Sequence, residues 1–366
     1  MIDKEIKRLY TIGPVEMFKE SLEIGGKQLP YFRTDEFSKI VLSAASGLKR
    51  LLFNEDGEII FLTASGTGAM EAVLMNCFSQ NDNLIIIDGG SFGHRFTEIC
   101  EVHQISYTAI KVEKDEMLTK SELEKCVNQG KFTGVLVNLD ETSIGKLYDI
   151  QMISEVCRNN GLILVVDAIS AFLADEVNMR KYGIDATIIS SQKALSLAPG
   201  LSIVALSQRM LERVNNINSG TVYFDFRSHL ENMKRGQTPF TPAVRILIEL
   251  EEAVRRFENI GIGNIIKNTH DIALDFRRKI QDIGLKIPSY ALSNAVTPVI
   301  FENGNALDVY QTLRNKYGYT VNPNGGEVGK YMFRVAHIGN CSIDDNDKLI
   351  DAISEIICEE KGAMDE

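Results

Sequence analysis

Between residues 58 and 206, short apolar blocks alternate with segments whose apolar positions recur at helical spacing. The blocks are rich in Val, Ile and Leu and show no polar–apolar alternation. Continuous apolar strands are typical of a parallel sheet that is covered by helices on both faces. We therefore predict strands at 59–63, 84–88, 106–112, 134–138, 162–167 and 186–190. The helical patterns between them lie at about 68–79, 92–102, 119–129, 150–160 and 176–182.

A seventh strand is predicted at 201–206, directly after Pro199-Gly200. This segment follows the sixth strand too closely for a helical crossover, so we expect it to run antiparallel. The fold class is therefore α/β, with a mostly parallel seven-stranded sheet and helices on both of its faces.

The whole chain divides into three parts, and its 366 residues are enough for two domains. Residues 1–30 are irregular and form an N-terminal arm, whereas 31–284 form the large domain. The large domain begins with a helix at 34–53 and ends in a largely helical stretch, 242–284, broken near Gly261. Residues 285–366 form a small C-terminal α+β domain. Its predicted strands are 285–288, 296–302 and 332–336, and its predicted helices are 305–317 and 343–359.

Composition excludes several classes of function. The net charge is −11 and no basic run is present, which argues against a nucleic-acid partner. No apolar run approaches the roughly 20 residues that span a bilayer, so no membrane partner is expected. The six cysteines show neither a CxxC pair nor metal-ligand spacing, and no metal site is predicted. A reduced, cytoplasmic setting fits this cysteine usage and the absence of a signal-peptide pattern.

Candidate chemistry gathers where the predicted strands end, which is where ligands bind in open α/β sheets. Residues 63–68, TASGTG, join a strand to a helix and could cradle a phosphate on backbone N–H groups. Simple capping of the helix by Ser or Thr explains the segment equally well. The spacing matches neither a Walker loop nor GxGxxG.

Lys193 and Asp167 are the two charged residues that the pattern makes most conspicuous. Lys193 follows the apolar strand 186–190, and Asp167 closes the apolar run LILVVD. Lys193 could be a solvated loop residue or a Schiff-base lysine whose pKa is lowered by burial. Asp167 could cap the next helix or face a buried cation. One crossover separates the two, so we expect neighbouring strands to carry them.

Four other residues extend the candidate site. Phe92 lies between glycines and could form a flat wall for a planar ring, although a core position is the commoner role. Thr142 and Ser143 follow a strand and could donate to a phenolate oxygen or shape a turn. Arg334 lies in the apolar run YMFRVAHIG, where it requires an internal acid or an anionic ligand such as a carboxylate or phosphonate.

A phosphate cradle, an aromatic wall, a phenolate donor, an aspartate and a buried amine together fit pyridoxal phosphate. With them, the chain resembles the class V aminotransferase family of fold-type I pyridoxal phosphate enzymes. It is most similar to the alanine–glyoxylate or serine–pyruvate branch and to the 2-aminoethylphosphonate–pyruvate branch. The motifs that carry the resemblance are ASGTGAMEA at 64–72, GSFGHR at 90–95, DETSIG at 140–145, VVDAIS at 165–170 and SSQKAL at 190–195.

The resemblance implies which residues bind the cofactor. They are Ser65, Gly66, Thr67 and Gln192 around its phosphate, Phe92 against its ring, Thr142 near its phenolic oxygen, Asp167 at its pyridine nitrogen and Lys193 as the aldimine lysine. Family members are homodimers with shared sites, which implies that Thr238 or Thr241 reaches the partner's phosphate. Arg334 is implied to bind the substrate carboxylate or phosphonate. Ala64 and Thr238 depart from the residues that many relatives carry, glycine and, in the alanine–glyoxylate branch, tyrosine.

The implied function is transfer of an amino group from a small donor of the alanine or serine type to pyruvate or glyoxylate. A 2-aminoethylphosphonate–pyruvate transaminase is the alternative, because Arg334 serves a phosphonate as well as a carboxylate in charge terms. Cysteine desulfuration is less favoured, since Phe92 stands where desulfurases carry a histidine. The nearest candidate for their mobile cysteine is Cys341.

Overall fold

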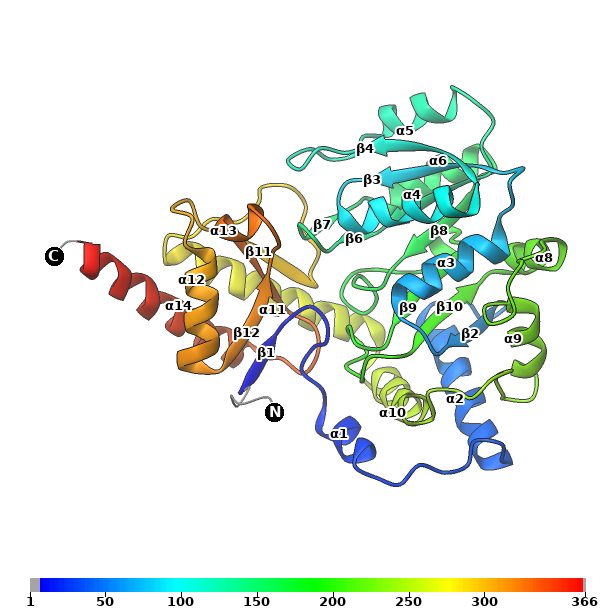
Figure 1. The fold of residues 1–366 in the computed structure, drawn as a ribbon, viewed down its shortest axis with the longest axis horizontal. Coiled ribbons are helices and arrows are strands. Elements are labelled where there is room, and N and C mark those ends of the chain that lie inside the picture. The colour runs from blue at the N-terminus through cyan, green and yellow to red at the C-terminus, as the bar shows by residue number, and fades with distance from the viewer. Residues whose placement is uncertain (1–6, 365–366) are drawn as a thin grey trace.

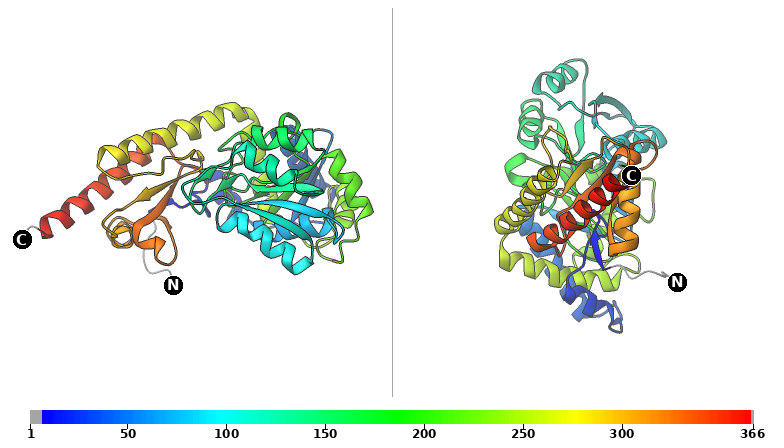
Figure 2. Two further views of the ribbon diagram at one scale, coloured as in Figure 1. Left: turned by 90° about the horizontal axis from the view of Figure 1, so that it is seen from above. Right: turned by 90° about the vertical axis from the view of Figure 1, so that its left-hand side faces the viewer.

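The computed structural model describes residues 7–364, with side chains described as far as residue 359. A large unit built on a seven-stranded sheet lies beside a smaller unit built on a four-stranded sheet (Figure 1). Seen from above in Figure 2, helices flank both faces of the large sheet. Of the described helices, none is long and apolar enough to cross a membrane.

The large sheet has the strand order β2-β10-β9-β8-β5-β3-β4. Its strands are β2 (Glu58–Leu62), β3 (Asn83–Asp88), β4 (Ser106–Lys111), β5 (Gly134–Asn138), β8 (Ile163–Asp167), β9 (Ala186–Ser190) and β10 (Ser202–Leu206). Strand β10 runs antiparallel to both of its neighbours, and the other pairs are parallel. The predicted sheet, including its antiparallel strand, is therefore confirmed.

Alternate residues of each central strand face two separate apolar cores. In β5, Val135 and Val137 contribute to the core beneath one face, and Leu136 contributes to the core beneath the other. Because both faces are covered, every residue of β5 is buried. This double burial is the physical reason why the strands appear in the sequence as uninterrupted apolar blocks.

Helices of the large unit complete these cores. The helices of the large unit are α2 (Asp35–Leu51), α3 (Gly66–Cys77), α4 (Ser91–His103), α5 (Lys120–Val127), α6 (Ile150–Asn159), α7 (Met179–Tyr182), α8 (Gln208–Asn216), α9 (Phe226–Met233) and α10 (Val244–Ile260). The short strands β6 (Asp140–Glu141) and β7 (Lys146–Leu147) form a hairpin beside the large sheet. Helix α9 was not predicted, and α7 is shorter than its predicted span.

The small unit has the sheet order β1-β12-β13-β11. Its elements are β1 (Arg8–Tyr10), β11 (Val296–Ile300), β12 (Tyr319–Pro323), β13 (Met332–Ala336), α12 (Ala306–Thr312), the π-helical turn η1 (Leu313–Tyr317), α13 (Val328–Tyr331) and α14 (Ile343–Met364). Strand β12 was missed by the sequence analysis. The strand predicted at 285–288 is wrong, because only an isolated bridge joins Lys286 to Ile300.

The expectation that residues 1–30 are irregular is also wrong for two segments. Strand β1 pairs in parallel with β12 and so joins the small sheet, and α1 (Lys19–Gly25) packs against the large unit. Three residues are too few to signal a strand by alternation, so only the pairing with β12 defines β1. We propose that the chain divides into an arm at 1–30, a large domain at 31–284 and a small domain at 285–366.

Long helices connect the two units. The predicted helical stretch 242–284 breaks at Gly261, whose φ of 84° lies in the region that favours glycine, into α10 and α11 (Ile262–Asp282). Helix α11 extends from the large unit toward the small one in Figure 2. It packs against α10, α14 and β11, which ties the small sheet to the large unit.

Helix α2 shows how the sequence builds one of these layers. Thr34 caps its first turn by accepting a hydrogen bond from the backbone N–H of Phe37 at 3.2 Å. Phe37, Val41, Ala44 and Leu48 are buried along one face, at the spacing predicted from the sequence. This face belongs to the core that also receives α10.

Replacement of Leu48 by Ala tests that packing. Leu48 is fully buried, so we expect the free energy of unfolding to fall by about 2–5 kcal/mol. The same substitution at Leu274, which is 55% exposed on α11, should change it by about 0.5 kcal/mol or less. Urea unfolding at one fixed protein concentration gives both values, and equal losses at the two positions would contradict this packing.

Candidate active site

Lys193 lies in the loop that follows β9, at the carboxyl end of the sheet. Its backbone N–H donates to Ser190 and its carbonyl accepts from Ser196 at 2.8 Å, so the loop is a tight bend. Among the described residues, its amine has neither an ion-pair partner nor a hydrogen-bond partner within normal distance. Burial lowers the pKa of Lys193 to about 8, although nearby acids raise it in part. An amine in this environment is partly neutral near physiological pH and is available as a nucleophile.

The segment after β1 covers Lys193. A Cβ atom on Gly13 would lie 2.9 Å from Cδ and Cε of Lys193 and 3.0 Å from its amine. Two residues on, the N–H of Val15 donates to the carbonyl of Gln192 at 3.2 Å. Glycine at position 13 thus lets the chain approach the lysine closely. The sequence analysis predicted an N-terminal arm but did not single out Gly13.

Asp167 ends β8, the strand next to β9, as predicted from the spacing. Its side chain is buried, and its two oxygens accept hydrogen bonds from the Asn138 side chain at 2.8 Å and the Ile169 N–H at 2.9 Å. Burial raises the pKa of Asp167 to about 6, while these two donors and Lys193 oppose the shift. Asp167 is therefore a carboxyl group that a nearby cation would readily ionise.

The predicted phosphate cradle lies at the start of α3. Ser65 is the N-cap, and its hydroxyl accepts from the Gly68 N–H at 3.3 Å. A Cβ on Gly66 would lie 2.4 Å from Cδ1 of Ile169, so the helix start is held against the segment that follows Asp167. The unpaired N–H groups of the first helical turn and the exposed Thr67 hydroxyl are free to meet an anion.

Phe92 is positioned by an acid that the sequence analysis did not single out. The buried carboxylate of Glu141 accepts from the backbone N–H groups of Phe92 at 3.3 Å and Gly93 at 2.8 Å, at the start of α4. A side chain at Gly90 would collide with it, at 2.4 Å from Cδ of Glu141. Phe92 itself is partly exposed. Glu141 therefore neutralises the start of α4 and fixes the place of Phe92.

Thr142 and Arg334 meet across the two units. The Thr142 hydroxyl is buried and lies 2.8 Å from the Ser170 hydroxyl, and the Thr142 carbonyl accepts from Arg334 at 2.9 Å. Arg334 also donates to the Pro323 carbonyl at 3.4 Å, while its Nε is buried without a partner. Arg334 forms no ion pair with any acid in the part of the chain that the structure describes. The internal acid that the sequence left open as its partner is absent there.

Residues 238–241 lie on a loop held by Arg33. The guanidinium of Arg33 donates to the carbonyls of Thr238 at 2.9 Å and Pro239 at 3.3 Å. Thr238 is buried and its hydroxyl donates to the Phe240 carbonyl at 2.7 Å, whereas Thr241 is exposed. Of the two predicted threonines, Thr241 is thus the one free to reach another molecule.

Gln192 completes the predicted set. Its side-chain oxygen accepts from the Ser190 hydroxyl at 2.7 Å, which leaves its amide N–H groups for a ligand. The structure therefore gathers one set of predicted residues at the carboxyl edge of the sheet: Ser65, Gly66, Thr67, Phe92, Thr142, Asp167, Gln192, Lys193 and Arg334. Thr238 and Thr241 lie on the loop held by Arg33. Asn138 was missed, although a polar residue ending the strand beside Asp167 was a usable signal.

These residues fit pyridoxal phosphate. Open helix N–H groups suit its phosphate, a buried acid suits its ring nitrogen, and an unpaired amine suits its carbonyl. Three observations support the fit: the unpartnered Lys193 amine, the unpartnered Nε of Arg334 and the tight cradle at Gly66. The fold and site together define a pyridoxal phosphate enzyme of fold type I.

The chain belongs to the family described as aminotransferase class-V, whose model matches residues 31–339. It is similar to an uncharacterized aminotransferase of Helicobacter pylori, at 28% identity over 90% of this chain and 88% of that protein. It is also 25% identical to the L-aspartate–glyoxylate aminotransferase of Paracoccus denitrificans, over 91% and 86% of the two chains. The solved alanine–glyoxylate aminotransferase of Nostoc sp. has the same fold, with a TM-score of 0.91, 22% identity and coverage of 98% and 97%. The protein is a pyridoxal phosphate-dependent aminotransferase.

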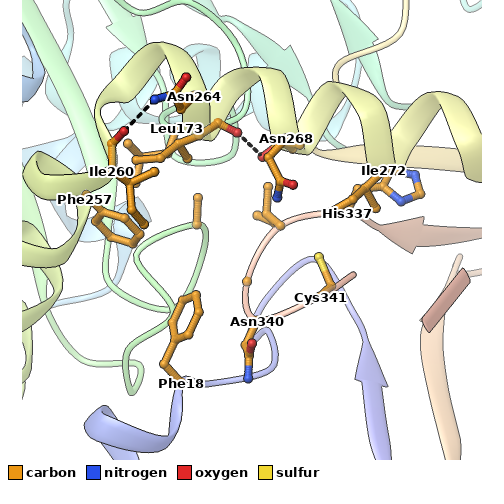
Figure 3. A pocket seen from close by; sticks show the side chains of 15 residues that line it. Phe18, Leu173, Phe257, Ile260, Asn264, Asn268, Ile272, His337, Asn340 and Cys341 are labelled. Atoms are coloured by element: carbon orange, nitrogen blue, oxygen red, sulfur yellow. Dashed lines mark hydrogen bonds between the residues drawn. The ribbon is translucent and has the colours of Figure 1, made fainter. Parts of the chain in front are cut away.

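A cavity of about 350 Å³ lies beside this site but does not contain Lys193 (Figure 3). Phe18 closes it on one side, the facing ends of α10 and α11 on another, and the loop 337–341 on a third. It lies behind Ala194, the residue after the lysine. The lining is largely apolar, and neither Asp167 nor the start of α3 contributes to it, so we do not assign the chemistry to this cavity.

Substitution of Gly13 by Ala tests the contact between the N-terminal segment and Lys193. The added methyl group displaces a flexible side chain, so we expect little loss of stability but a shifted amine. A shift of about 1 Å at a reacting group costs up to roughly a hundredfold in rate. We therefore expect pyridoxal phosphate added to the apoprotein to develop its visible absorbance about ten to a hundred times more slowly.

Gly325→Ala is the matched control, because no atom lies within 4 Å of a Cβ at that position. Wild-type uptake of the cofactor by Gly13→Ala would show that the N-terminal segment does not set the position of Lys193.

Proposed function

We propose that the protein transfers the amino group of a small α-amino acid, of the alanine or serine type, to glyoxylate or pyruvate. One observation carries the proposal. Among the residues that the structure describes, neither the Lys193 amine nor the Arg334 guanidinium has an ion-pair partner, and the two groups lie within electrostatic reach of each other. Two cations in one buried site require anionic or electron-withdrawing ligands. A cofactor with a phosphate and a carbonyl, and a substrate with a carboxylate, supply them.

Arg334 is the proposed binding group for the substrate carboxylate. Its hydrogen bonds to the carbonyls of Thr142 and Pro323 hold the planar guanidinium in place. Burial lowers its pKa, and two acids nearby oppose this shift, but neither forms an ion pair with it. A guanidinium with a free edge is suited to a bidentate carboxylate.

Lys193 is the proposed residue that binds the cofactor's carbonyl and moves the proton at the substrate Cα. When bound, pyridoxal phosphate supplies an electron-withdrawing ring that stabilises negative charge at that carbon. The lowered pKa of Lys193, about 8, lies near physiological pH, which is the range in which a group both accepts and donates a proton effectively. The contact with Gly13 limits the directions in which the amine can move.

Asp167 is the proposed partner of the ring nitrogen, where it would hold a proton. The hydrogen bonds from Asn138 and Ile169 fix its carboxyl group and stabilise its charged form. Ser65, Gly66, Thr67 and Gln192 are the proposed phosphate ligands. Phe92, held by Glu141, would cover the ring, and Thr142 would lie near its phenolic oxygen.

We further propose a homodimer with shared sites in the cytoplasm. The Tyr223 ring stacks on the Phe240 ring at 5.3 Å, and both are partly exposed beside Thr241. Val222 and Tyr31 are 79% and 67% exposed. Phe240 lies on the loop that carries Thr241 and stacks on Tyr223, so this exposed aromatic pair supports a subunit contact there. All six cysteines are unpaired, which supports a reducing compartment.

The two alternative functions differ in what supports them. A 2-aminoethylphosphonate donor is compatible with the charge of Arg334, so a donor comparison has to decide it. Cysteine desulfuration requires a reactive thiol, and burial raises the pKa of Cys341 to about 12. This thiol lines the separate cavity of Figure 3 and would be protonated at neutral pH. Desulfuration is therefore not favoured.

The absorbance spectrum of the purified protein tests the proposed function. L-alanine, L-serine and 2-aminoethylphosphonate are added separately, and we expect the visible band of the bound cofactor to fall with alanine or serine and to return with glyoxylate. Lys193→Ala should lack both the band and the turnover, whereas Lys131→Ala, which changes an exposed lysine, should behave as wild type.

A response to 2-aminoethylphosphonate alone would show that the amino donor carries a phosphonate group instead of a carboxylate. A bound cofactor that responds to none of the three donors would refute the proposed donor class, and activity of Lys193→Ala would refute the role of the lysine.

Substitution of Asp167 by Asn should have opposite effects on stability and on cofactor binding. Burial raises the pKa of Asp167 from about 3.9 in the unfolded chain to about 6, so ionisation costs the folded apoprotein stability. This cost is absent below about pH 4, where the carboxyl group is protonated in both states, and it is complete once the pH has risen through about 6. An asparagine side chain at position 167 does not ionise in this pH range. Its amide N–H can donate to Asn138 Oδ1, which has no partner among the described residues, if the Asn138 amide group flips.

Apo Asp167→Asn should therefore be more stable than the wild type at about pH 8 and should retain pyridoxal phosphate less well. Urea unfolding of the apoproteins at about pH 4 and about pH 8, with cofactor release on dialysis, measures both effects. Unchanged cofactor retention would reduce Asp167 to a structural role.

A further inference from the structure

Asp140 is a buried acid that the proposed mechanism does not use. Its side chain is 1% exposed, and neither of its carboxyl oxygens has a hydrogen-bond partner among the described residues. It forms no ion pair with any described cation. Burial of a carboxyl group without a hydrogen-bond partner is unfavourable, so a carboxyl group in this state points to a ligand that completes it.

Each of the three acids near Asp140 accepts hydrogen bonds from protein donors, whereas Asp140 accepts none within the described part of the chain. Asp167 accepts from Asn138 and Ile169, Glu141 accepts from the start of α4, and Asp175 accepts from the Ser293 hydroxyl at 2.6 Å and the Asn294 N–H at 3.2 Å. The Ser293 hydroxyl also lies near Asp140, but its single proton is directed to Asp175.

The chain places Asp140 between the two ends of the proposed substrate site. Two residues before it, Asn138 donates to Asp167, and two residues after it, the Thr142 carbonyl holds Arg334. Asp140 also lies within electrostatic reach of both the Lys193 amine and the Arg334 guanidinium. When an amino acid has its carboxylate on Arg334 and its amino group near Lys193, its α-carbon has two substituents left: the hydrogen that Lys193 would remove and the side chain.

We propose that Asp140 determines donor specificity by hydrogen-bonding the side chain of the amino donor. The chemical class it selects is an uncharged polar side chain, such as the hydroxyl group of L-serine, over a methyl group and over an anionic side chain such as that of L-aspartate. This inference rests on the proposed function and specifies the donor for the same site.

The electrostatics of the pocket support this choice. Burial, and next the neighbouring Asp175, raise the pKa of Asp140 well above its ordinary range. A neutral carboxylic acid can donate one hydrogen bond and accept another, which matches a hydroxyl group in both directions. An anionic side chain in this place would meet a neutral acid instead of a cation, and burying a carboxylate without a cation is strongly disfavoured.

The test is a single-turnover comparison of donors with the cofactor-loaded enzyme. The rate at which each donor removes the visible band is measured against concentration for L-serine, L-alanine and L-aspartate. We expect the wild type to prefer serine to alanine and alanine to aspartate. Asp140→Ala should lower the serine-to-alanine ratio by about tenfold, which corresponds to about 1.4 kcal/mol for one lost hydrogen bond to the transition state.

Two further variants separate specificity from structure. Asp140→Asn keeps one donor and one acceptor and should retain the serine-to-alanine ratio within about threefold. Asp185→Asn is the matched control at a buried acid whose partners, the Leu164 N–H and the Ser207 hydroxyl, are structural, and it should leave the ratio unchanged. Removal of an unpartnered acid should also raise the melting temperature of Asp140→Asn and Asp140→Ala.

Equal losses with serine and alanine in Asp140→Ala, a melting temperature below that of the wild type, or a wild-type preference for L-aspartate would each overturn the proposal. These outcomes leave the wild type reactive. A wild type with bound cofactor that reacts with none of the donors shows instead that the proposed function has failed, and the inference about Asp140 fails with it.

Discussion

The high cost of removing charged groups from water governs the edge of the large sheet where the strands end. Four such groups lie there: Lys193, Asp167, Asp140 and Arg334. Burial raises the pKa of the two acids and lowers the pKa of the two bases, so it favours the neutral form of each group. A folded chain tolerates such a cluster when ligands complete it. The cofactor and substrate of an aminotransferase carry the complementary groups, so the same desolvation that weakens the apoprotein prepares the site for binding.

The surrounding structure serves to hold these groups in place. Glu141 is one such supporting residue. Its carboxylate binds the start of α4 and thereby fixes Phe92, without itself facing the proposed substrate. The N-terminal segment acts in a similar way, because Gly13 packs directly against the Lys193 side chain. Rigid supports of this kind let a few charged side chains keep their geometry across a buried site.

The junction of the two units decides where Arg334 lies. Arg277 of α11 donates to Thr297 at 2.9 Å and to the carbonyl of Ser293, and Asp175 of the large unit accepts from Ser293. These bonds fix the small sheet against the large one, and the Thr142 carbonyl then receives Arg334. A change at this junction would therefore act on the substrate-binding arginine without touching it directly.

The sequence by itself determined the large sheet and the motifs at its edge. Uninterrupted apolar blocks arise only when both faces of a strand are buried, so the strands ending at Asp167 and Ser190 could be recognised from their residues alone. The tertiary structure decided what depends on contacts distant in sequence. Strand β1 exists because β12 lies beside it, and Gly13, Glu141 and Asp140 acquire their importance from neighbours 180, 49 and more than 50 positions away. The spacing of apolar residues along the sequence indicates which face of a helix or strand is buried. The partner of a buried charged group is fixed only when segments distant in sequence come together in the folded chain.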